Sequence, residues 1–145
     1  MKKKQKQRIL LIGVVVALVG GIIGFNYYID QVKIKGGIFS NQIEQIQEDL
    51  TNLQIDFETN VNIYEENDIT KKEFLELSEK HFTKMEELIQ RYDELNPPDP
   101  FAASVDLFKL SAESQLQRDK QIALWIETGD ESYSIRADEL HQESF

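Results

Sequence analysis

The chain has no cysteine, and it holds only two histidines and three prolines among its 145 residues. The lack of cysteine excludes a disulfide framework, thiol catalysis and a lipid-modified cysteine. The two histidines, His81 and His141, show neither the H-E-x-x-H spacing of a zinc site nor the paired Glu-x-x-His pattern of a di-iron bundle. Phosphate-binding glycine loops and a nucleophile elbow around a serine are also missing. We therefore predict no catalytic residue, no cofactor and no metal site.

Positive charge is scarce outside the N-terminus. Residues 1–37 carry seven Lys or Arg and one acidic residue, whereas residues 38–145 carry nine Lys or Arg and 25 acidic residues. Because an acidic body repels phosphate backbones, nucleic acid is not an expected partner. Proteins with basic surfaces, or cations, fit this charge. The turn Glu65, Glu66, Asp68 is either a solvated turn or a weak cation site.

A long hydrophobic run begins at residue 9 and holds no charged residue before Asp30. A helix over residues 9–29 would be roughly 31 Å long, enough to cross a hydrocarbon core. The basic tail 1–8 should stay in the cytoplasm and place the C-terminal body outside. A cleaved signal peptide is the alternative, but no A-x-A cleavage site follows the run. We predict an uncleaved signal-anchor helix and a single-pass cell-membrane protein, with topology set by Lys2, Lys3, Lys4, Lys6 and Arg8.

Small residues recur along the predicted membrane helix at Gly13, Ala17, Gly21 and Gly24. A face of small residues allows close approach of a second helix in lipid, so this face predicts membrane-helix packing. The alternative is that glycine is simply common in membrane helices. The expected partners are therefore the lipid bilayer and, through the anchor, a protein or a second copy of this chain.

After a linker over residues 30–39 containing Gly36-Gly37, the pattern is helical to the end of the chain. Ser40 is a plausible N-cap for a first helix ending near Tyr64. Thr70 and Glu73 form a capping-box pattern for a second helix, which Asn96-Pro97-Pro98 ends. Asp99-Pro100 should cap and open a third helix, and Gly129 and Asp130 should stop it and cap a short fourth.

Apolar residues at steps of three and four give each predicted helix one buried stripe. Leu107, Leu110, Leu124 and Trp125 should widen the apolar face of the third helix. We predict an all-α protein: one N-terminal transmembrane helix, then an acidic extracytoplasmic domain over 40–145 that forms an antiparallel three-helix up-down bundle with a short fourth helix. The stripes are Ile43, Ile46, Leu50, Leu53, Phe57, Val61, Tyr64; Phe74, Leu77, His81, Met85, Leu88, Tyr92, Leu95; and Phe101, Val105, Phe108, Ala112, Leu116, Ala123, Ile126.

The segment from about 85 to 145 carries Arg91-Tyr92-Asp93, Asn96-Pro97-Pro98, Leu107-Phe108, Ser114-Gln115-Leu116 and Trp125-Ile126 before Thr128-Gly129-Asp130. This run resembles small, uncharacterised single-pass membrane-anchored proteins of archaea, including those of ammonia-oxidising archaea. Similar Pro-Pro and Thr-Gly-Asp turn sequences are found in helical surface domains of Gram-positive bacteria. The resemblance implies a membrane-anchored helical surface protein without an assigned reaction, and it carries over no functional residue.

Two functions fit these features. The first is a non-catalytic structural or interaction protein, an accessory subunit or surface module of a membrane assembly. The second is an extracytoplasmic ligand-sensing bundle that signals through a partner, with Trp125, Tyr92 and His81 as candidate ligand contacts. We expect His81, on an apolar stripe, to be a partly buried histidine with a hydrogen-bond partner. An enzyme is the weakest hypothesis, because no acid, base or metal constellation is visible.

Overall fold

The computed structural model describes residues 21–24 and 37–143, and every element in this part of the chain is helical. The elements are α2 (Gly37–Glu65), α3 (Lys71–Asp93), the single-turn 3-10 helix η1 (Asp99–Phe101), α4 (Ala102–Thr128) and α5 (Glu131–Glu143). The predicted all-α class is therefore confirmed, as are three long helices followed by a short one.

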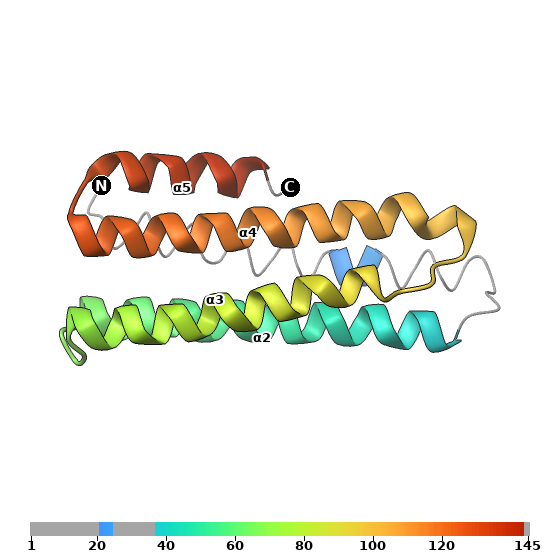
Figure 1. Cartoon of the computed structure of the whole chain (residues 1–145), viewed down its shortest axis with the longest axis horizontal. Coiled ribbons are helices and arrows are strands. Elements are labelled where there is room, and N and C mark those ends of the chain that lie inside the picture. The colour runs from blue at the N-terminus through green and yellow to red at the C-terminus, as the bar shows by residue number, and fades with distance from the viewer. Residues whose placement is uncertain (1–20, 25–36, 144–145) are drawn as a thin grey trace.

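The helices run up and down beside one another (Figure 1). α2 packs against α3, α3 against α4, and α4 against α5. In each of these three pairs the two helices are antiparallel. α5 turns back along the C-terminal half of α4 and ends before it reaches the other half (Figure 1). The start of α2 and the η1 connection lie at one end of the bundle, opposite the α2–α3 turn and the α4–α5 turn.

Two of the predicted helix boundaries have the expected capping chemistry. The Glu73 amide donates to the Thr70 hydroxyl (3.1 Å), and the Thr70 amide donates to the Glu73 carboxylate (2.7 Å). These bonds lower the pKa of Glu73. Gly129 ends α4 in the left-handed region at φ 75°, and the Asp130 carboxylate accepts from the Ser132 amide (2.9 Å) at the start of α5.

Two boundaries differ from the prediction. α2 begins at Gly37 rather than after Ser40, because Phe39 is buried beside Phe101 with the ring centroids 6.1 Å apart. Asp99 does not cap the third helix: η1 opens at Pro98, and the Phe101 amide donates to the Pro98 carbonyl at 2.8 Å. A tight 3-10 turn supplies this bond where Pro100 has no amide hydrogen, and it brings Phe101 into the core.

The core follows the predicted stripes with one exception on α4. Ala112, Leu116 and Ala123 are buried as expected. Leu107 and Leu110, predicted to widen the apolar face, are 67% and 57% exposed. Since α5 is too short to reach this half of α4, no described helix covers these two leucines.

The predicted membrane helix falls almost wholly outside the described residues. Within the part of the chain that the structure describes, no helix has both the length and the hydropathy to cross a bilayer. The basic residues Lys2, Lys3, Lys4, Lys6 and Arg8 lie outside the described ranges, as do Gly13 and Ala17 and most of the linker. Residues 21–24 are described and helical.

Candidate functional site

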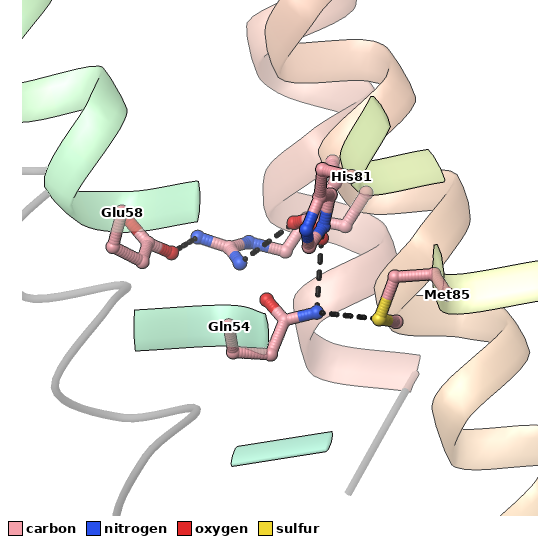
Figure 2. Close-up of polar contacts among 6 residues, drawn as sticks. Gln54, Glu58, His81 and Met85 are labelled. Atoms are coloured by element: carbon pink, nitrogen blue, oxygen red, sulfur yellow. Dashed lines mark hydrogen bonds and ion pairs between the residues drawn. The ribbon is translucent and has the colours of Figure 1, made fainter. Parts of the chain in front are cut away.

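A cluster of polar side chains lies in the middle of the bundle, where an apolar core would be expected (Figure 2). α2 contributes Gln54 and Glu58, α3 contributes His81, and α4 contributes Arg118 and Asp119. None of the five is more than 5% exposed, and Gln54 and Asp119 are fully buried. We call these five residues the core cluster.

Arg118 lies between the two carboxylates of the core cluster. One terminal guanidinium nitrogen donates to Glu58 Oε1 at 2.6 Å, and the other donates to Asp119 Oδ1 at 3.2 Å. Both contacts are charge-assisted, and the shorter one joins α4 to α2. The single guanidinium of Arg118 therefore pairs with both buried carboxylates.

Asp119 is the acceptor on which the cluster converges. One of its carboxylate oxygens, Oδ1, accepts from Arg118. The other, Oδ2, contacts His81 Nε2 at 2.8 Å and accepts from Gln54 Nε2 at 2.9 Å. A single carboxylate on α4 is thereby bonded to side chains of both α2 and α3. The arrangement satisfies a charge that would be strongly unfavourable if left alone in the core.

His81 is packed as well as hydrogen-bonded. Its ring stacks on Phe57 with the centroids 4.6 Å apart and an interplanar angle of 25°. One turn further along α3, the Met85 sulfur lies 3.7 Å from Gln54 Nε2 (Figure 2). The expectation of a buried, partnered histidine is confirmed, with the partner being Asp119.

Burial changes the acid–base properties around Arg118. Desolvation raises the pKa of Glu58 from 4.5 to about 7, against the opposing effect of Arg118, and the charges of Asp119 and Glu65 raise it further. On α5, burial lowers the pKa of His141, and the charge of Arg118 lowers it further. The Glu58 carboxyl is therefore held close to the balance between its charged and neutral forms at neutral pH.

The space beside the cluster is small. A cavity of about 20 Å³ lies between α2, α4 and α5, bordered by Glu58, Arg118, Trp125, Ser134 and Asp138 among others. This volume is close to that of one water-sized probe, far below the hundreds of cubic ångströms of a typical small-molecule pocket. A substrate or metabolite does not fit beside the core cluster in this conformation.

The three aromatic residues considered for ligand contact do not share a cavity. His81 belongs to the core cluster, whereas Tyr92 lies eleven residues further along α3, about 16 Å away at the helical rise. The Tyr92 hydroxyl accepts from Gln47 Nε2 at 2.8 Å, and burial raises the pKa of Tyr92. Trp125 borders the small cavity near Glu58.

Metal-binding geometry is not found among the described residues. No group of three or more His, Asp or Glu side chains there is placed to hold an ion, and this includes the acidic turn after α2. Two further acids on α2, Asp56 and Glu58, point to opposite sides of the helix, since Asp56 is exposed and Glu58 is buried. The predicted absence of a metal site stays a prediction for the chain as a whole.

Of the predicted membrane-packing residues, only two are described. Gly21 lies close to α4: a Cβ added at this residue would be 3.6 Å from the Phe108 ring, an ordinary van der Waals distance. A Cβ added at Gly24 would meet no neighbouring atom within 4 Å, and Gly24 is exposed. The predicted packing face with Gly13 and Ala17 is therefore untested.

Sequence reasoning missed most of the core cluster. Only His81 was recognised, because it was the one polar residue counted on an apolar stripe. The α4 stripe steps from Leu116 directly to Ala123, and Asp119 fills this seven-residue gap at the expected helical position. Gln54 directly follows Leu53 of the α2 stripe, so no gap in that stripe marked it. The interruption of the α4 stripe by a polar residue was thus the available signal.

Comparison of this chain with protein-family models, with curated proteins and with solved structures found no match. The resemblance to archaeal membrane-anchored proteins therefore stays a prediction. A functional proposal has to depend on the geometry and charge of the chain itself.

Proposed function

We propose that this protein is a membrane-anchored, non-catalytic interaction module. Residues 9–29 span the bilayer, the basic tail 1–8 lies in the cytoplasm, and the helical bundle is presented on the outer side. The length and apolar character of the segment support the anchor, and the excess of basic residues before it supports the orientation.

The main support for a non-catalytic role is that the side chains of the core cluster are buried and bonded to one another. Its charged groups bind one another at 2.6–3.2 Å and are at most 5% exposed, so they are engaged in holding the bundle together. A general base or nucleophile has to reach a substrate at hydrogen-bond distance. The core cluster offers no such access.

Exposed leucines on α4 support a contact role. Leu107 and Leu110 lie one turn apart on the same face and are more than half exposed. Single exposed apolar residues are common, but an adjacent pair beyond the reach of α5 is a natural contact for another protein.

The position of Gly21 favours a second arrangement. A residue inside the bilayer cannot also touch Phe108, which belongs to the bundle in water, yet Gly21 lies beside Phe108 in this structure. In the second arrangement, the described turn 21–24 stays on α4 and the segment does not cross the membrane at this point. The two arrangements make opposite predictions for the same positions.

Cysteine labelling tests the anchored arrangement, because the chain has no native cysteine that would react in the background. In intact cells, a membrane-impermeant maleimide should label Thr83→Cys on exposed α3, and it should label Gln5→Cys only after permeabilisation. Gly21→Cys should resist labelling in both conditions. Labelling of all three only after lysis, with release of the protein by alkaline extraction, would refute the anchored topology.

A paired variant tests the second arrangement directly. Gly21→Cys combined with Phe108→Cys should give an intramolecular cross-link with a short bismaleimide if residues 21–24 remain on α4. The matched control, Gly21→Cys with Thr83→Cys, should not. The anchored topology predicts no cross-link in either pair.

Ligand sensing is the weaker proposal. Its three candidate residues line no common cavity, and the space beside the core cluster is about 20 Å³. A thermal-shift screen of small polar metabolites against the full chain is expected to leave the unfolding temperature unchanged. A saturable, stoichiometric shift that Tyr92→Phe removes would instead support a sensor.

A further inference from the structure

The negatively and positively charged groups of the core cluster are unequal in number. It holds two carboxylates, Glu58 and Asp119, and one guanidinium, Arg118, which stays protonated in proteins. If both carboxylates are ionised and His81 is neutral, the buried group carries a net charge of −1. One additional proton, on His81 or on Glu58, makes it neutral.

A net charge in a core is strongly disfavoured, and these side chains are at most 5% exposed. We propose that the core cluster binds one exchangeable proton and acts as a pH-sensitive joint that holds α2 against α4 when the proton is bound and loosens when it leaves. This inference does not depend on membrane attachment.

The joint connects two helices that do not pack directly along one another. α2 and α4 each pack along α3, and the bonds from Glu58 to Arg118 and from Gln54 to Asp119 connect them across the bundle. When the proton leaves, two ionised carboxylates share one guanidinium. Their repulsion acts directly along the connection between the two helices.

Among residues 21–24 and 37–143, the titratable groups around the cluster do not supply the missing positive charge. On α2, Glu65 adds negative charge near Glu58, and on α5 Asp138 borders the same cavity. His141 of α5 is the remaining candidate, but burial and the charge of Arg118 lower its pKa. α3 contributes His81, itself a member of the core cluster, which contacts Asp119.

The direction of the effect follows from the Glu58 carboxyl. Its pKa is raised from 4.5 to about 7 in the folded protein, so folding favours the protonated form. The resulting stabilisation is complete below pH 4.5 and is lost as the pH rises through about 7. The joint is therefore tight under mildly acidic conditions and loose under alkaline ones.

The test uses the full chain in detergent micelles, unfolded with urea at a series of pH values from acid to alkaline. Far-ultraviolet circular dichroism follows the helices, and Trp125, the single tryptophan, reports from the wall of the small cavity. The folding equilibrium constant of the wild type should fall on the order of 100-fold from pH 5 to pH 9. Glu58→Gln, a permanently neutral isostere, should remove most of this fall and exceed the wild type in stability at pH 9.

Two further variants fix the interpretation. Glu48→Gln changes an exposed glutamate on the same helix and should follow the wild-type curve. His81→Gln keeps Glu58 and Arg118 in place, so it should retain the pH dependence even if it is less stable overall. An infrared band of a buried protonated carboxyl should be present in the wild type at pH 6 and absent in Glu58→Gln. Parallel pH curves for the wild type and Glu58→Gln, or the absence of that band, would overturn the proposal.

Discussion

The two halves of α4 contradict the simple rule that apolar residues are buried and charges are exposed. In the N-terminal half, Leu107 and Leu110 are 67% and 57% exposed. In the C-terminal half, Arg118 and Asp119 are 1% and 0% exposed. Both halves belong to one continuous helix, so local helix-forming tendency does not explain the difference.

Neighbouring helices explain it instead. α5 covers only the C-terminal half of α4 (Figure 1). In that half, Glu58 of α2 bonds to Arg118 and His81 of α3 contacts Asp119. Beyond the end of α5, the same helix has one fewer partner and keeps its leucines at the surface. Burial on α4 is therefore set by which helix lies opposite each turn, and charges are tolerated where partners are supplied.

The largest expected effect is in the covered half. Arg118→Met leaves Glu58 and Asp119 buried without their shared cation, and removal of one partner from a buried ion pair costs about 3–5 kcal/mol. Urea unfolding at pH 7, followed by circular dichroism, measures this loss. Arg136→Met on α5 is the control, because Arg136 is 47% exposed in its contacts with Glu139 and Glu143. Equal losses from the two variants would break the comparison.

An intermediate effect is expected for Gln54→Leu. It removes the hydrogen bond to the Asp119 carboxylate while preserving most of the side-chain volume, and this should cost about 1–3 kcal/mol. Gln115→Leu is the matched control: Gln115 is about equally buried, but its side-chain amide donates only a long, 3.3 Å hydrogen bond to the neutral Ser111 hydroxyl. The same unfolding assay should show Gln115→Leu near wild type. A neutral Gln54→Leu would show that the cluster does not need the Gln54 hydrogen bond.

The smallest effect is expected in the uncovered half. Leu107→Gln and Leu110→Gln change exposed positions, so each should alter the free energy of unfolding by less than about 0.5 kcal/mol. Leu116→Gln, at a buried position six residues after Leu110, should be strongly destabilising. Thermal unfolding of the three variants ranks them. A large loss from Leu107→Gln would mean that another part of the protein covers this face.

The fold was largely predictable because its signals are local. Helix periodicity, the Thr70–Glu73 capping box and the left-handed Gly129 each depend on residues within a few positions of one another. The start of α2 and the η1 turn were predicted wrongly because both depend on the contact between Phe39 and Phe101, which are 62 residues apart. Contacts at such separation leave no local pattern.

The core cluster was mostly unpredictable for the same reason. Glu58 and Arg118 are 60 residues apart, and each reads locally as an ordinary surface charge on a helix. His81 was identified because it interrupts an apolar stripe, and Asp119 could have been found by the same criterion. The exposure of Leu107 could not be inferred, since it depends on where α5 ends.

The most direct test of the proposed function is cross-linking with mass spectrometry on intact native membranes. A membrane-anchored interaction module should give reproducible cross-links at constant stoichiometry from exposed lysines such as Lys80 and Lys84 to one membrane assembly or to a second copy of this chain. The Leu107→Gln, Leu110→Gln variant should weaken them. Intramolecular cross-links alone, with the protein released from the membranes by alkaline extraction, would contradict both the anchor and the interaction role.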